Sequence, residues 1–148
     1  MTQMSKKEIK VFLMRGTLTG KLATVKKDGG PHLVPIWFII DNNNDKTNII
    51  FTTNSTSAKA KNIQRDNRVC ICVDDQKPPF SFVMIYGIAK IHHCGQNELF
   101  KWATKIAERY VGKSNANAYG KRNSTEGEVL VLIKPTKIIA EKDIAGWD

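Results

Sequence analysis

The sequence predicts a mainly β domain in which six or seven mostly antiparallel strands curve into a closed or partly closed barrel with helices outside it. Two observations support this fold class. Short apolar stretches recur between turn residues, and the Asp28-Gly29 pair between two of them is a strong hairpin signal. Only one stretch has the pattern of a long helix. The expected strands span residues 21–25, 32–40, 47–53, 68–73, 80–92, 128–134 and 136–140.

The first half of the chain begins with a short helix. It is expected at residues 5–15, where Ser5 and Glu8 form a capping-box pattern ahead of apolar residues at helical spacing. Pro35 lies inside the second expected strand and cannot donate a ladder hydrogen bond, so this strand should have an edge or a bulge there. Residues 41–46 are polar and are expected to form a turn.

The second half contains the longest expected elements. The strand 68–73 is apolar on both faces, which predicts burial on two sides. Gly87 suggests a bend in the strand that follows, and Pro135 interrupts the last extended run. The long helix spans residues 98–111, whereas the polar stretch 113–126 is expected to be a mobile loop or lid.

The length and the cysteine content describe an ordinary intracellular domain. A chain of 148 residues fits a single domain, residues 1–148, that can bury a sufficient core without disulfides. Its three cysteines are an odd number and are expected to be reduced thiols. No apolar run reaches the roughly 18 residues of a membrane helix, and the N-terminus lacks the features of a signal peptide. We therefore expect a cytoplasmic protein that does not bind membranes.

The positive charge favours an anionic partner. The formal net charge is +9, but the lysines and arginines are spread along the chain and form no basic arm. A nucleic-acid-binding barrel would also need aromatic residues interleaved with basic ones on one exposed sheet face. Most strand aromatics lie in runs expected to be core, so we expect no nucleic-acid partner and favour a local anion pocket.

A candidate pocket lies in the stretch 49–74, where a strand and a hydroxyl-rich turn lead into a short helix opening at Thr56 or Ser57. The first N–H groups of a helix lack partners within it and lie at the positive end of its dipole, so hydroxyls and the ammonium of Lys59 can converge on a phosphate. The same residues also fit a plain N-cap at Ser57 with Lys59 and Lys61 in solvent.

The order of these segments resembles the pyridoxamine 5′-phosphate oxidase-like split β-barrel family. The resemblance covers roughly residues 8–141, and its segments are LATVKKDGGPHLVPIWF, IIFTTNSTSAKAKNIQRDNRV, VMIYGIAKI, ERYVG and VLVLIKPTKII. Its most specific piece is S-x-K-x-x-N followed by R-D-x-R-V. The resemblance implies a homodimer with two cofactor sites at its interface, each built from both chains.

The resemblance also implies roles for particular residues. Those that would hold the cofactor phosphate are Thr52, Thr53, Ser57 and Lys59. Those that would line the isoalloxazine-type ring are Val34, Pro35, Ile36 and Trp37. Asn62 would cap or brace the helix behind the site. From the residues alone, Trp37 fits a core aromatic as well as a ring contact.

One departure from the family bears on the reaction. Oxidases acting on pyridoxamine phosphate have Ser-Arg-Lys in the cradle, and this chain has Ser57-Ala58-Lys59, which lacks a bidentate phosphate ligand. The Ser-Ala-Lys-Ala form is similar to members that bind deazaflavin coenzyme F-420. The resemblance therefore implies a reductase that transfers a hydride between F-420 and a small conjugated substrate, with an FMN-dependent oxidoreductase or a non-catalytic flavin- or haem-binding module as alternatives. The cofactor carries the hydride, and no protein group is assigned as acid or base.

The run His92-His93-Cys94 raises the question of a metal site. Adjacent strand residues point to opposite faces, so the three cannot bind one ion without a turn, and we expect no metal site. Cys70 and Cys72 are expected to be small buried apolar residues.

Overall fold

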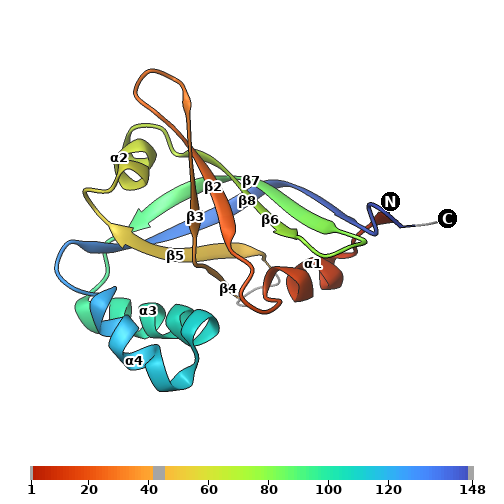
Figure 1. Cartoon of the computed structure of the whole chain (residues 1–148). Coiled ribbons are helices and arrows are strands. Elements are labelled where there is room, and N and C mark those ends of the chain that lie inside the picture. Colours follow the sequence, from red (N-terminus) through yellow and green to blue (C-terminus); the bar gives the residue numbers. More distant parts are fainter. Residues whose placement is uncertain (1, 42–45, 147–148) are drawn as a thin grey trace.

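The computed structural model describes residues 2–41 and 46–146, and Figure 1 shows its elements. The strands are β1 (Thr2–Gln3), β2 (Gly20–Val25), β3 (Pro31–Ile36), β4 (Ile39–Asp41), β5 (Asn48–Asn54), β6 (Arg68–Asp75), β7 (Ser81–His92) and β8 (Glu128–Lys142). The helices are α1 (Lys6–Leu13), α2 (Ala58–Arg65), α3 (Gln96–Val111) and α4 (Lys113–Arg122). Among the described residues, no helix has the length and apolar character needed to cross a membrane.

The strands form one antiparallel sheet in the order β3-β2-β6-β7-β8-β5-β4, with β1 paired to β8. Within the described ranges the end strands β3 and β4 do not pair with each other, so the sheet is not a fully closed barrel. Its core includes the fully buried rings of Phe12, Phe38 and Phe51. In Figure 1, α3 and α4 lie side by side below β5, and α2 lies above it. The predicted antiparallel sheet with helices outside it is confirmed.

The helix starts and the first hairpin follow local signals. Both hydrogen bonds of the Ser5–Glu8 capping box are formed, and Ser57 is the N-cap of α2. The β2–β3 hairpin closes through the N–H of Lys26 and the carbonyl of Gly30, 2.8 Å apart. Of the expected turn at residues 41–46, residues 42–45 lie outside the described ranges.

The expected strand 32–40 is two strands, which corrects the prediction. β3 ends at Ile36 and β4 begins at Ile39. Between them, the N–H of Phe38 donates to the Tyr110 hydroxyl and the carbonyl of Phe38 accepts from Arg109. Two side chains of α3 therefore make the hydrogen bonds to the Phe38 backbone that a neighbouring strand would otherwise make. Pro35 lies in an edge strand, as predicted.

The expected bend at Gly87 is a bulge between β7 and β8. The register shifts between Tyr86 and Gly87, so that Thr136 becomes the extra residue and donates its hydroxyl to the Tyr86 carbonyl at 3.1 Å. A methyl group on Gly87 would lie 2.6 Å from the carbonyl oxygen of Lys134. The two strands are therefore so close at this point that only glycine fits. The bulge accommodates Pro135, and β8 continues through it rather than being interrupted there.

The prediction that strand 68–73 is buried on both faces is wrong. In β6 the alternating residues Val69, Ile71 and Val73 are buried, whereas Cys70 and Cys72 are only partly buried. The same outer face continues on β7, where Tyr86 is 42% exposed. In the described chain, the sheet buries only its concave face here, so aromatic and apolar residues remain on the outside.

The polar stretch 113–126 is largely a helix, which also corrects the prediction. α4 packs against α3 through its small residues Ala116 and Gly120. Gly120 lies so close to Thr104 that an added methyl group would meet the threonine hydroxyl at 2.1 Å. Since helix packing here uses small residues instead of large apolar ones, the usual apolar periodicity is missing.

Candidate functional site

The turn between β5 and α2 arranges hydroxyl groups at the start of the helix. The Ser57 hydroxyl accepts from the N–H of Ala60 at 3.2 Å and lies 2.9 Å from the Thr53 hydroxyl. Asn54 closes the turn by accepting from the N–H and the hydroxyl of Thr56. The expected hydroxyl-rich helix start is therefore formed, with Thr53 and Ser57 in contact.

Beside this turn is a cavity of about 240 Å³. Its lining residues are Pro35, Ile36, Trp37, Thr52, Thr53, Lys59, Ile106, Asn123 and Glu128. The structure thus brings together the first six of these, all of which the sequence resemblance names. It adds Ile106 from α3, Asn123 after α4 and Glu128 at the start of β8, none of which we predicted.

The other three predicted residues do not line the cavity. Ser57 contacts Thr53, which does line it. Asn62 is buried and donates to the Thr24 hydroxyl at 3.0 Å, which ties α2 to β2. Val34 is partly buried against the main core. Ser57 therefore contacts a residue that lines the cavity, whereas Asn62 and Val34 hold the surrounding elements together.

Lys59 and Glu128 place opposite charges in this cavity. Burial lowers the pKa of Lys59, and the Glu128 carboxylate partly opposes this effect. Burial raises the pKa of Glu128, which the hydrogen bond to Asn54 and the charge of Lys59 partly oppose. Within the described residues, Lys59 forms no ion pair at 4.0 Å or less. A half-buried ammonium without a close counterion fits an incoming anion.

The β5–β8 pairing explains why sequence reasoning missed Glu128. Asn54, the last residue of β5, pairs directly with Glu128, the first residue of β8. The residues are far apart in the sequence, and only the register brings the carboxylate to the cavity. This β5–β8 register is a long-range contact that no short sequence pattern records.

Trp37 is held by α3 at the edge of the cavity. Its ring stacks on Tyr110, with centroids 5.1 Å apart and an interplanar angle of 6°. The Tyr110 hydroxyl donates to the Leu18 carbonyl at 2.9 Å and accepts from the N–H of Phe38 at 3.1 Å. Arg109 donates to the Phe38 carbonyl at 2.7 Å. Arg109 and Tyr110 of α3 therefore position Trp37, one of whose ring faces is covered by Tyr110.

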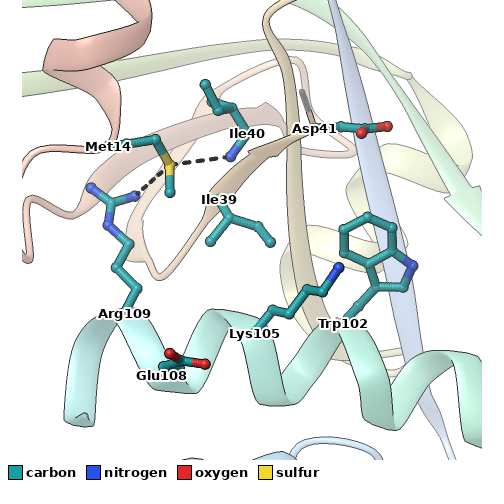
Figure 2. Close-up of a pocket in the computed structure, with 8 residues that line it drawn as sticks. All are labelled: Met14, Ile39, Ile40, Asp41, Trp102, Lys105, Glu108 and Arg109. Carbon is teal, nitrogen blue, oxygen red and sulfur yellow. Dashed lines mark hydrogen bonds between the residues drawn. The ribbon is translucent and has the colours of Figure 1, made fainter. Parts of the chain in front are cut away.

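A larger cavity, about 540 Å³, lies elsewhere along α3 and is shown in Figure 2. It is lined by Met14, Ile39, Ile40, Asp41, Trp102, Lys105, Glu108 and Arg109, and so contains no predicted site residue. Figure 2 shows the Arg109 guanidinium directed to the Met14 sulfur, which also accepts from the N–H of Ile40. We place the candidate site in the smaller cavity, where hydroxyls, a helix start and a lysine converge.

The fold and this cavity define a small, partly closed antiparallel barrel with a pocket suited to an anionic group beside the first turn of α2. The chain belongs to the pyridoxamine 5′-phosphate oxidase family, because the sequence model described as pyridoxamine 5′-phosphate oxidase matches residues 5–140. The family resemblance expected from the sequence is thereby confirmed. No curated protein matches the chain significantly.

Solved structures share the fold. A conserved hypothetical protein of Mycobacterium tuberculosis is 27% identical, with a TM-score of 0.80 over 95% of this chain and 86% of its own. An F-420 reductase is 22% identical, with a TM-score of 0.64 over 86% of this chain and 94% of its own. A haem storage protein of Vibrio cholerae is 15% identical, with a TM-score of 0.68 over 90% of this chain and 93% of its own.

Proposed function

We propose that this protein is a reductase that transfers a hydride between deazaflavin coenzyme F-420 and a small conjugated organic substrate. The observation that carries the proposal is the half-buried Lys59 beside the Thr53 and Ser57 hydroxyls, in the same cavity as the Pro35–Trp37 segment. Membership of the family and the shared fold of an F-420 reductase support it. Ala58 in place of the family's cradle arginine argues against a pyridoxamine phosphate oxidase.

The chain's own residues would bind and orient the cofactor. Lys59 and the Thr52 and Thr53 hydroxyls would hold its phosphate beside the start of α2. The segment from Pro35 to Trp37 would contact the ring, and Tyr110 and Arg109 keep that segment in place. When bound, the cofactor supplies the hydride chemistry. We assign the accompanying proton to no protein group.

We further propose that a second copy of the chain completes the site. Ligand cavities usually measure about 300–1,000 Å³, and the cavity in one chain is smaller than this range, at about 240 Å³. The outer sheet face carries exposed apolar side chains at Leu33, Tyr86 and Ile88, which are 66%, 42% and 39% exposed. Such a face fits a homodimer interface, and Leu33 on it lies two residues before Pro35, which lines the candidate cavity. Sedimentation of the purified chain measures its oligomeric state. A monomer at micromolar concentration would contradict the proposed homodimer.

A parallel fluorescence titration of the cofactor-free protein with F-420 and with FMN tests the proposed cofactor. We expect micromolar or tighter binding of F-420 and weaker binding of FMN. The reverse order would make the protein an FMN-dependent oxidoreductase, since both cofactors carry a phosphate on a ribityl chain and suit the same cradle. Failure of both would reject the cofactor proposal, and haem would be titrated next because a haem storage protein shares the fold.

The carboxylate of Glu128 should oppose phosphate binding. We expect Glu128→Gln to tighten cofactor binding about fivefold at neutral pH, because it removes a negative charge from the cavity. Burial raises the pKa of Glu128, so this group becomes protonated at a higher pH than an ordinary glutamate. The difference between variant and wild type should therefore shrink as the pH falls. The exposed Glu126→Gln is the matched control, and equal effects of the two changes would contradict the assignment.

A further inference from the structure

Three side chains with metal-binding atoms meet where β7 leads into α3. His92 is the last residue of β7, Cys94 lies in the connection, and Glu98 is in the first turn of α3. One ligand atom from each lies within 4.8 Å of the other two. His92 Nε2 and Glu98 Oε1 are 3.8 Å apart. This group lies outside both cavities described above.

The change from strand to helix explains why this set differs from the run in the sequence. His92 and Cys94 are two residues apart and share a side of the extended chain, while His93 lies between them and is outside the group. The chain then turns at Gly95, the N-cap of α3, and the third residue of the helix is Glu98. The third ligand atom therefore comes from the Glu98 carboxylate on the helix and not from His93.

We propose that His92, Cys94 and Glu98 form a binding site for a divalent transition-metal ion of the zinc class. Sulfur, imidazole nitrogen and carboxylate oxygen are the ligand types that zinc accepts, and hard cations such as Mg²⁺ do not favour thiolate. Three protein ligands leave a fourth tetrahedral position for water. On binding, the Cys94 sulfur gains a bond to the metal and its thiol proton passes to solvent. Thiolate and carboxylate then balance the two positive charges of the ion.

The geometry is close to what such an ion requires. Tetrahedral zinc holds sulfur, nitrogen and oxygen ligand atoms about 3.3–3.6 Å apart. His92 and Glu98 are exposed, so their side chains can rotate inward without disturbing the core. Cys94 is partly buried against the apolar cluster that contains Ile39, Ile50 and Leu99, which holds the sulfur in place. Cys94 is thus held in place by packing, and the side chains of His92 and Glu98 can adjust to the ion.

A metal at this point would join the end of β7 to the start of α3. The same helix carries Ile106, which lines the candidate cavity, and Arg109 and Tyr110, which position Trp37. Because a ligand that binds only the folded state stabilises it, the ion should raise the melting temperature of the protein. The effect does not depend on whether the protein binds F-420.

The test is a Co²⁺ titration of the purified full chain, because a thiolate bound to Co²⁺ absorbs in the near ultraviolet. We expect one equivalent of Co²⁺ to produce this band and Zn²⁺ to displace it. Cys94→Ser should abolish the band, and His92→Gln should weaken Co²⁺ binding by about tenfold or more. His93→Gln and Cys70→Ser are the matched controls and should bind as the wild type does. Zn²⁺ should raise the melting temperature of the wild type and of His93→Gln but not that of Cys94→Ser.

Three results would overturn the proposal. Binding of Co²⁺ without a thiolate band would show attachment to surface histidines only. A band that survives in Cys94→Ser would place the sulfur ligand at another cysteine. Absence of Co²⁺ binding at micromolar metal would reject the site. Circular dichroism of Cys94→Ser checks that this variant is folded, so that a lost band reports a lost ligand and not an unfolded chain.

Discussion

Arg109→Ala is expected to lower the free energy of unfolding by about 3–4 kcal/mol, the largest stability effect we predict. The guanidinium donates to the carbonyls of Leu13 and Phe38, both at 2.7 Å, and to that of Gly16 at 3.0 Å. These carbonyls belong to the end of α1, the loop after it and the break between β3 and β4. One side chain thus joins α3 to three segments, and alanine would leave partly buried carbonyls without a donor.

Urea denaturation of the variant, with Lys101→Ala beside it, measures this effect. Lys101 is an exposed cation on the same helix, so its loss should change stability by less than about 0.5 kcal/mol. The stability loss of Arg109→Lys should lie between those of Arg109→Ala and Lys101→Ala, because lysine keeps the charge but not the planar set of donors. A stability loss of less than about 1 kcal/mol for Arg109→Ala would show that the loop is held by other contacts.

Lys59→Ala is expected to weaken cofactor binding by about 10–100-fold, which is the loss of one charge-assisted contact. The ammonium lies in the candidate cavity together with Thr52 and Thr53, and burial lowers the pKa of Lys59 because the charge is partly removed from water. A phosphate placed there would recover the lost stabilisation of that charge. Fluorescence titration with F-420, or with FMN if FMN binds better, measures the change.

The matched control is Lys61→Ala, on the same helix two residues later. Lys61 is exposed and does not line the cavity, so this variant should bind the cofactor within about twofold of the wild type. Equal losses in the two variants would mean that only the general positive charge of α2 matters. An unchanged affinity in Lys59→Ala would remove the cradle from the proposed function.

The elements that could be predicted are those with a local cause. The capping box at Ser5 and Glu8, the Asp28-Gly29 turn and the Ser57 N-cap each depend on residues within a few positions of one another. Alternation along the expected strand 80–92 defined its two faces but not which of them is buried, because both sets of side chains are largely apolar. The same local signals placed Thr52, Thr53 and Lys59 near the start of α2, which are three of the nine residues that line the candidate cavity.

The remaining parts of the site depend on pairing between distant segments. Glu128 reaches the cavity because β8 pairs with β5 in one particular register. The strand breaks after Ile36 because Arg109 and Tyr110, more than 70 residues later, satisfy the backbone of Phe38. Glu98 joins His92 and Cys94 only after α3 has started. No pattern within a short window of sequence records these contacts.

The sequence by itself determined an antiparallel barrel, the starts of α1 and α2, and the residue types of a phosphate cradle, since hydrogen bonding and side-chain alternation act over short distances along the chain. Tertiary structure alone decided that residues 113–122 form a helix, because α4 packs through Ala116 and Gly120 onto α3 without large apolar residues. It also decided which face of β6 is buried, because the curvature of the sheet encloses one side and leaves Cys70 and Cys72 on the other.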